Sequence, residues 1–154
     1  MNEPISIERF AAADLDAVIA LWQAAGVARP WNDPQRDIAF ACRDAHSTLL
    51  VARRGPVVVG TSMVGEDGHR GWLYYVAVAP AEQGRGLGRR LMAAAEQWLR
   101  ARGVWKVQLL IRADNATARQ FYERLDYRDT QTVCMQKVIE SPGSAITAVQ
   151  AGRA

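Results

Sequence analysis

The first third of the chain switches between strand-like and helix-like spacing of its apolar residues. Residues 5–10 alternate apolar and polar positions, as a half-buried strand does, and apolar residues then recur at helical spacing over residues 15–25 before a glycine ends the run. Beyond a loop, Asp33 followed by Pro34 is typical of an N-cap and a first helical residue. This pair predicts a second helix that reaches about residue 45.

Three strands are predicted next. Residues 48–53 and 57–64 are rich in apolar and β-branched residues, and the segment Arg54-Gly55-Pro56 between them is typical of a hairpin turn. A second turn at Asp67-Gly68 leads into a strand over residues 72–78. Because short turns join the three runs, we expect an antiparallel meander.

The second half of the chain returns to helices. An apolar stripe at helical spacing follows a glycine-rich segment and continues until Gly103. A strand over residues 104–111 and a helix over 115–125 come next, and residues 127–138 are expected to form a last strand or pair with a bend near Asp129. The pattern predicts a mixed α/β (α+β) fold.

Length and composition fit one globular domain. The chain has 154 residues, of which 49% are hydrophobic, enough for one core of ordinary size. We expect a single domain over residues 1–139 and a flexible tail over 140–154, where small residues offer no strong core face. The chain has neither the roughly 20 consecutive apolar residues that cross a membrane nor a signal-peptide layout at its start. These features predict a cytoplasmic protein without a membrane partner.

The cysteine and charge content argues against a metal-binding and a nucleic-acid-binding protein. Cys42 and Cys134 show no Cys-x-x-Cys spacing, so we expect free, buried thiols and no metal site. The formal net charge is +3, and the arginines are scattered except for Arg85, Arg89 and Arg90. A nucleic-acid-binding protein shows a denser basic stripe, whereas a local basic spot suits a phosphorylated small molecule.

The glycine-rich segment Gln83-Gly84-Arg85-Gly86-Leu87-Gly88 lies between a predicted strand and a predicted helix. At a helix start the first backbone N–H groups lack helical partners and point along the positive end of the helix dipole, an arrangement that attracts phosphate. The three glycines carry no Cβ, so a diphosphate can approach the main chain, and Arg85 or Arg89 can add charge.

Two well-known phosphate loops do not fit this segment. A Walker loop ends in Gly-Lys-Ser/Thr, whereas this one ends in Gly88-Arg89-Arg90. A Rossmann loop spaces its glycines GxGxxG at the start of its fold, whereas these are spaced GxGxG after several strands. A purely structural strand-to-helix turn remains as the alternative.

A second motif lies in the segment from Asn115 to Tyr122. At helical spacing, Asn115, Ala118 and Tyr122 share one face, and the small Ala118 leaves room for a ligand chain along the helix. From the residues alone, Asn115 could equally cap the helix and Tyr122 could be a core aromatic.

With the preceding Val76-Ala77-Val78-Ala79-Pro80, the glycine segment resembles the Gln/Arg-x-x-Gly-x-Gly/Ala motif of the GCN5-related N-acetyltransferases (GNAT). The resemblance covers residues 5–139. It implies a mostly antiparallel sheet of six to seven strands with about four helices, in the order strand, two helices, three strands, helix, strand, helix, two strands. The segments 29–34 and 67–71 resemble the bacterial branch of this family called YpeA.

The resemblance implies a function: acetyl-CoA donates its acetyl group, without a metal, to an amine acceptor that attacks directly in a ternary complex. The backbone of strand 76–78 would bind the pantetheine arm, and the glycine segment the pyrophosphate. Tyr122 would protonate the departing thiolate as general acid, and the Val78 N–H would stabilise the acetyl oxygen. The implied donor-binding residues are Val76, Ala77, Val78, Gln83, Gly84, Arg85, Gly86, Leu87, Gly88, Arg89, Asn115, Ala118 and Tyr122.

The sequence departs from the family pattern at the general base. Many relatives carry a glutamate where this chain has Trp72 or Leu110. Four residues remain as candidates, each with a turn or cap as its simpler explanation: Asp33, Glu66, Asp67 and His69.

The position of the acceptor site in this family implies acceptor contacts for Trp31, Asn32 and Tyr75, although Trp31 could instead pin its loop. Metabolite, peptide and protein amines all stay open as acceptors, as does a homodimer. The alternative from another class is a coenzyme A-binding regulatory or interaction module without catalysis.

Overall fold

The computed structural model describes residues 3–140 as two compact units. The larger unit comprises residues 3–29 and 33–109, and the smaller comprises residues 30–32 and 110–140. No helix among residues 3–140 is long and apolar enough to cross a membrane.

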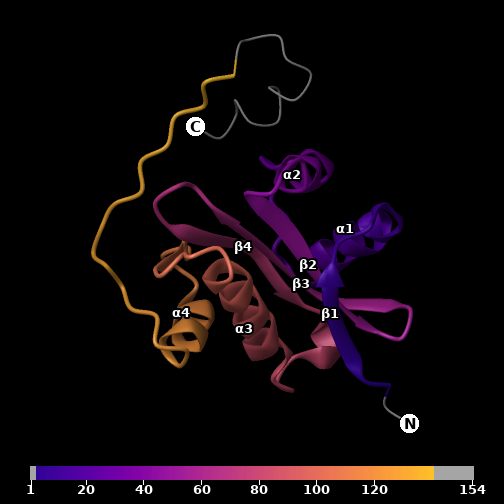
Figure 1. The fold of residues 1–154 in the computed structure, drawn as a ribbon. Coiled ribbons are helices and arrows are strands. Elements are labelled where there is room, and N and C mark those ends of the chain that lie inside the picture. Colours follow the sequence, from indigo (N-terminus) through magenta and orange to yellow (C-terminus); the bar gives the residue numbers. More distant parts are fainter. Residues whose placement is uncertain (1–2, 141–154) are drawn as a thin grey trace. The chain divides into compact units, whose positions relative to one another are not determined.

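The larger unit is a five-stranded sheet with helices, coloured from indigo to red in Figure 1. The strand order is β1-β2-β3-β4-β5. The first three pairings are antiparallel, and two of them, β2–β3 and β3–β4, form the predicted meander; β4 pairs with β5 in parallel. Its elements are β1 (Ile5–Arg9), a 3-10 turn (Ala12–Asp14), α1 (Leu15–Ala24), α2 (Pro34–Ala41), β2 (Ser47–Arg54), β3 (Val57–Glu66), β4 (Gly71–Val78), a 3-10 turn (Pro80–Glu82), α3 (Leu87–Arg100) and β5 (Val107–Leu109).

Helices cover both faces of this sheet. Figure 1 shows α1 and α2 on one side and α3 on the other. Successive side chains of β2 face opposite sides of the sheet, so Val51 packs with Trp22 of α1, whereas Ala52 packs with Leu91 of α3. Leu87, the first residue of α3, belongs to the same cluster as Ala52 and Leu91.

The smaller unit contains α4 (Ala116–Glu123). The strand or pair expected over residues 127–138 is not formed; these residues carry no regular structure, and Val133 and Met135 are 86% and 90% exposed. The chain bends where Asp126 and Gln131 adopt left-handed φ values of 68° and 57° and Asp129 Oδ1 accepts a hydrogen bond from Gln131 N (2.7 Å). Such turns interrupt strand pairing.

The mixed α/β fold class is confirmed, with several differences in detail. The second helix ends at Ala41 rather than near residue 45, because Ser47 Oγ donates to the Ala41 carbonyl (2.7 Å) and ends the helical pattern. Both cysteines are free as expected, but they are exposed: Cys42 follows the last turn of α2 and Cys134 lies in the irregular segment. The expected tail lies beyond the described residues from 141 onward.

Candidate active site

Strand β4 has an open edge where it approaches the glycine segment. Its parallel pairing with β5 stops at Leu73 and Leu109 in the part of the chain that the structure describes, so residues 74–78 have a β-strand neighbour only on the β3 side. Ala79 N donates to Val59 O of β3 (2.8 Å). Because successive residues of a strand direct their N–H groups to opposite sides, the Val78 N–H faces the open edge.

A β-bulge distorts β4 at Tyr75. The register with β3 shifts between Thr61 and Met63, and Tyr75 has φ of 49°, a left-handed value that only a few per cent of non-glycine residues adopt. Thr61 Oγ1 donates to Tyr75 O (2.8 Å) and accepts from the buried Trp22 Nε1 (2.8 Å). The Trp22 and Tyr75 rings stack with centroids 3.7 Å apart. The bulge is therefore fixed by both backbone and ring contacts.

The bulge directs the Tyr75 phenol to Asp37 of α2. Tyr75 Oη donates to Asp37 Oδ2 (2.6 Å), and both side chains are half-buried. Burial is the main cause that raises the pKa of Asp37, and the Asp33 carboxylate adds to it; the Tyr75 hydrogen bond and Arg36 act in the opposite direction. Sequence reasoning missed Asp37, whose only signal was a second carboxylate one turn after the Asp33 cap.

The glycine segment leads directly from β4 into α3. Gly84 and Gly86 have φ of 76° and 83°, the left-handed region that glycine adopts without strain, and Gly86 is the N-cap of α3. The first helical hydrogen bond runs from Arg90 N to Gly86 O (3.2 Å), so the N–H groups of residues 87–89 have no partner within the helix. These amides form the anion-attracting end that the sequence predicted.

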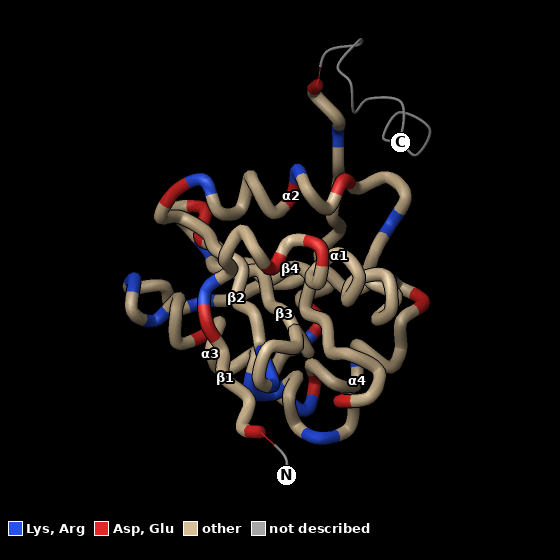
Figure 2. Tube along the Cα trace, turned by 90° about the vertical axis from the view of Figure 1, so that its right-hand side faces the viewer, with Lys and Arg blue, Asp and Glu red and all other residues tan. Residues whose placement is uncertain are grey.

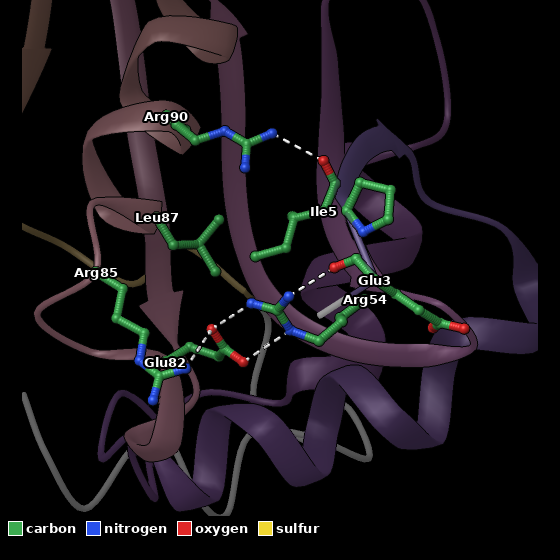
Figure 3. Close-up of a pocket in the computed structure, with 8 residues that line it drawn as sticks. Glu3, Ile5, Arg54, Glu82, Arg85, Leu87 and Arg90 are labelled. Atoms are coloured by element: carbon green, nitrogen blue, oxygen red, sulfur yellow. Dashed lines mark hydrogen bonds and ion pairs between the residues drawn. The ribbon is translucent and has the colours of Figure 1, made fainter. Parts of the chain in front are cut away.

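Side chains brace this segment on both sides. Gln83 Nε2 donates to Val78 O (3.2 Å), which ties the loop to the end of β4. Figure 3 shows Arg54 in a two-pronged contact with Glu82, with Nε–Oε1 and Nη2–Oε2 distances of 3.0 and 2.8 Å. The Arg54 guanidinium lowers the pKa of the Glu82 carboxyl. Arg54 and Glu82 line a pocket of about 300 Å³ that Arg85 and Arg90 also border.

The smaller unit holds the second motif. Asn115 Oδ1 accepts from Ala118 N (3.0 Å), so Asn115 is the N-cap of α4, the simpler of its two expected roles. Tyr122 meets Phe121 and Tyr127 edge to face, and burial raises the pKa of its phenol to about 12. The phenol therefore keeps its proton at neutral pH. In the same unit, the Arg112 guanidinium lies 4.7 Å from the centre of the Trp31 ring.

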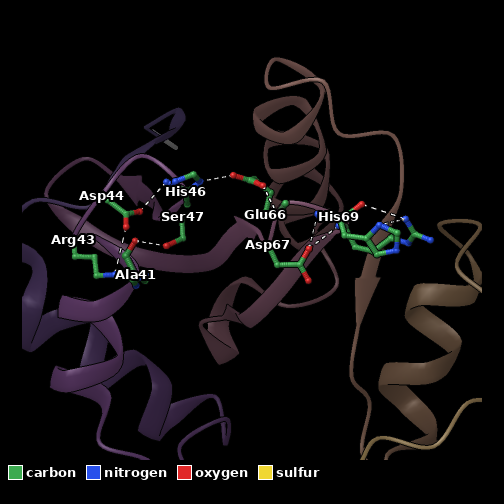
Figure 4. Close-up of polar contacts among 10 residues, drawn as sticks. Ala41, Arg43, Asp44, His46, Ser47, Glu66, Asp67 and His69 are labelled. Carbon is green, nitrogen blue, oxygen red and sulfur yellow. Dashed lines mark hydrogen bonds and ion pairs between the residues drawn. The ribbon is translucent and has the colours of Figure 1, made fainter.

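The carboxylates considered as bases are engaged in local structure. Asp33 Oδ1 accepts from Arg36 N (3.1 Å) as the cap of α2. Figure 4 shows the end of the β3–β4 hairpin, where Glu66 pairs with His46 Nδ1 (2.5 Å) and accepts from Gly68 N. Asp67 accepts from Trp72 Nε1 (2.9 Å) and from the amides of residues 69 and 70. Their simpler explanations, as caps and turn residues, agree with these contacts.

The predicted site residues thus divide between the two units. Tyr75, the strand segment 76–78 and the loop 83–89 follow one another along the edge of the larger unit, whereas Trp31, Asn32, Asn115, Ala118 and Tyr122 belong to the smaller unit. Both acidic and basic residues occur along the described part of the trace (Figure 2). No group of three or more His, Cys, Asp or Glu among residues 3–140 is arranged to hold a metal ion.

Solved structures share this fold. One is AAC(6')-Iy in complex with the bisubstrate analogue CoA-S-monomethyl-acetylneamine, with a TM-score of 0.75 and 16% identity over 88% of this chain and 99% of that chain. Another is the ribosomal-protein-S18-alanine N-acetyltransferase from Escherichia coli, with a TM-score of 0.67 and 25% identity over 79% of this chain and 76% of that chain.

Sequence comparison identifies the family. The profile of the Acetyltransferase (GNAT) family matches residues 15–127. Acetyltransferase YE1169 of Yersinia enterocolitica is 38% identical over 133 residues, 86% of this chain and 94% of its own length. Acetyltransferase SG1711 of Sodalis glossinidius is 39% identical over 131 residues, 85% of this chain and 92% of its own length. The chain therefore belongs to the acetyltransferase (GNAT) family and is an acetyl-CoA-dependent N-acetyltransferase.

Proposed function

We propose that the protein transfers the acetyl group of acetyl-CoA to a primary amine by direct attack within a ternary complex, and that residues 1–139 form its catalytic domain. The open edge of β4, which continues into a loop with unpartnered amides, carries this proposal. An extended pantetheine arm can pair with the backbone of residues 76–78 as an added strand, and its pyrophosphate can bind the amides of residues 87–89.

The reaction needs two groups around the thioester. As the amine nitrogen attacks the acetyl carbon, negative charge develops on the acetyl oxygen, and the Val78 N–H at the open edge is the donor we assign to it. When the intermediate collapses, the C–S bond breaks and the thiolate takes a proton. We assign this proton to Tyr122, whose phenol stays protonated because its pKa is about 12.

The names of two solved structures support an amine acceptor. The Escherichia coli structure is named for a ribosomal-protein alanine, and AAC(6')-Iy was solved with the bisubstrate analogue CoA-S-monomethyl-acetylneamine. Both acceptors are amines. A primary amine is accordingly the acceptor that we propose, without choosing between a metabolite and a protein terminus.

Initial-rate kinetics with varied acetyl-CoA and amine test the order of events. Direct attack predicts double-reciprocal lines that intersect, whereas parallel lines would show an acetyl-enzyme intermediate and contradict the ternary complex. Tyr122→Phe should lower kcat by roughly 10²-fold or more, with acetyl-CoA affinity retained. An unchanged kcat would remove Tyr122 from its role.

A coenzyme A-binding module without catalysis is the competing function. It is favoured by the absence of a glutamate at Trp72 and Leu110. A thermal shift with acetyl-CoA combined with no turnover of any amine would support that module.

A further inference from the structure

The Tyr75–Asp37 contact has the geometry of a proton relay. An amine is mostly an ammonium ion at neutral pH and must lose a proton before it attacks. We propose that Tyr75 contacts the acceptor ammonium and that Asp37 receives, through Tyr75 Oη, the proton that the ammonium loses. This inference rests on the proposed function, since it concerns the acceptor half of the same reaction.

The position of the Tyr75 phenol is strongly constrained. Its backbone has the left-handed φ of the bulge, its carbonyl accepts from Thr61 Oγ1, and its ring lies flat against the fully buried Trp22. Strained backbone of this kind persists where the surroundings fix it, often at functional sites. A bulge also redirects a side chain out of the regular strand pattern, here toward α2.

Asp37 differs from the other carboxylates that were considered as bases. Asp33, Glu66 and Asp67 accept hydrogen bonds from backbone amides of caps and turns. Asp37 instead accepts a short hydrogen bond from a phenol, and its half-buried position leaves it reachable from solvent.

Among the described residues, two charged side chains act on Asp37. Asp33, the N-cap of α2, and Arg36 act on it in opposite directions, and burial is the largest cause of its raised pKa. Against α2 lie Tyr75 from β4, apolar core side chains from α1 and β2, and Ser47 of β2, whose hydroxyl donates to Ala41 O. A carboxylate with a raised pKa is a better proton acceptor than an ordinary aspartate.

The proton transfer balances without any further reactant. An N–H bond of the ammonium breaks and its proton passes to Tyr75 Oη, while the phenol proton moves to Asp37 Oδ2. The tyrosine ends as a neutral phenol, Asp37 ends protonated, and the amine is left with its electron pair free to attack. Tyr75 is thus a catalytic residue in this step, and Asp37, which acts through it, is a positioning residue.

The place of Tyr75 along β4 suits this step. It lies three residues before Val78 on the same strand, at most about 10 Å along it. The relay places the acceptor amine at Tyr75 Oη, on the strand whose Val78 N–H is assigned to the acetyl oxygen. The relay also supplies the base that Trp72 and Leu110 cannot provide.

Asp37→Asn tests the relay with the least structural change. The asparagine oxygen can still accept the Tyr75 hydrogen bond but cannot take up a proton. With a primary amine, kcat/KM of the wild type should be flat between the pKa of Asp37 and that of the amine. In Asp37→Asn it should fall roughly 10²-fold at pH 7 and rise about tenfold per pH unit toward the amine pKa, because only free amine reacts.

Controls separate this effect from a structural one. Asp37→Asn should match the wild type in acetyl-CoA affinity and in thermal midpoint. Asp37→Glu should restore part of the flat pH profile. Asp16→Asn, on the exposed side of α1, should change neither the rate nor the pH profile. A wild-type rate in Asp37→Asn would overturn the relay, and so would a reduced rate with an unchanged pH profile.

Tyr75→Phe provides a second, independent test, which also decides if Asp37→Asn does not fold. It should reproduce the sloping pH profile, and a flat profile would overturn the relay. A wild-type protein that releases no thiol with any amine contradicts the proposed function and this inference together. An active wild type with unaffected Asp37 and Tyr75 variants contradicts this inference alone.

Discussion

Replacement of Gly86 by leucine tests whether the glycine segment binds acetyl-CoA. A Cβ at Gly86 would meet no atom within 4 Å, so the fold has room for a side chain, but φ of 83° is strained for any residue except glycine. That strain costs about 1–2 kcal/mol, which lowers the thermal midpoint by about 2–8 °C in a chain of this size. The new side chain would also stand beside the amides that we assign to the pyrophosphate.

The other end of the same helix offers a matched control. Gly103 has φ of 80° and open space around a Cβ, so Gly103→Leu should cause a similar loss of stability. Acetyl-CoA at a hundred times its Kd stabilises a protein by about 2.7 kcal/mol. Differential scanning fluorimetry should show a rise of about 5–11 °C for the wild type and Gly103→Leu, and none for Gly86→Leu. A full rise in Gly86→Leu would show that acetyl-CoA does not bind at the glycine segment.

Two further predictions concern contacts that support the site. Thr61→Val leaves the buried Trp22 Nε1–H without its acceptor and should lower the free energy of unfolding in urea melts by about 1–3 kcal/mol. Ser62→Ala removes a buried hydroxyl that has no partner among the described residues, so it should be neutral or stabilising in the same measurement. Glu82→Gln should lower the thermal midpoint at pH 7. Because Arg54 lowers the pKa of Glu82, this difference should shrink as the pH falls below about 4.3, the pKa of a free glutamate, and vanish once the pH is below the lowered pKa of Glu82. A difference that persists at low pH would contradict the ion-pair explanation.

Local signals predicted most elements of the fold. The Asp33–Pro34 cap, the turns at Gly55 and Gly68 and the glycine end of α3 depend on neighbouring residues only, and the structure has each of them. The last strands failed as predictions because a strand also needs a partner edge, which residue spacing does not specify. The prediction of buried cysteines was wrong for a similar reason, because burial depends on tertiary packing.

In the candidate site, too, the sequence predicted the parts that depend on neighbouring residues and not those that depend on tertiary contacts. The loop 83–89 has a sequence signature, because glycines and a helix start produce its geometry locally. Asp37 has none: its importance depends on a bulge that turns Tyr75 from its regular strand direction toward α2, 38 residues away in sequence. The roles of Tyr122 and of the acceptor residues Trp31 and Asn32 stay predictions, as does the resemblance to the YpeA branch.

The decisive experiment measures thiol release when the wild-type protein is mixed with acetyl-CoA, with and without a panel of primary amines. We expect release that depends on the amine, with one acetylated amine found by mass spectrometry for each thiol formed. Thiol release at the same rate without any amine, or none with every amine while acetyl-CoA still raises the thermal midpoint, would contradict acetyl transfer to an amine.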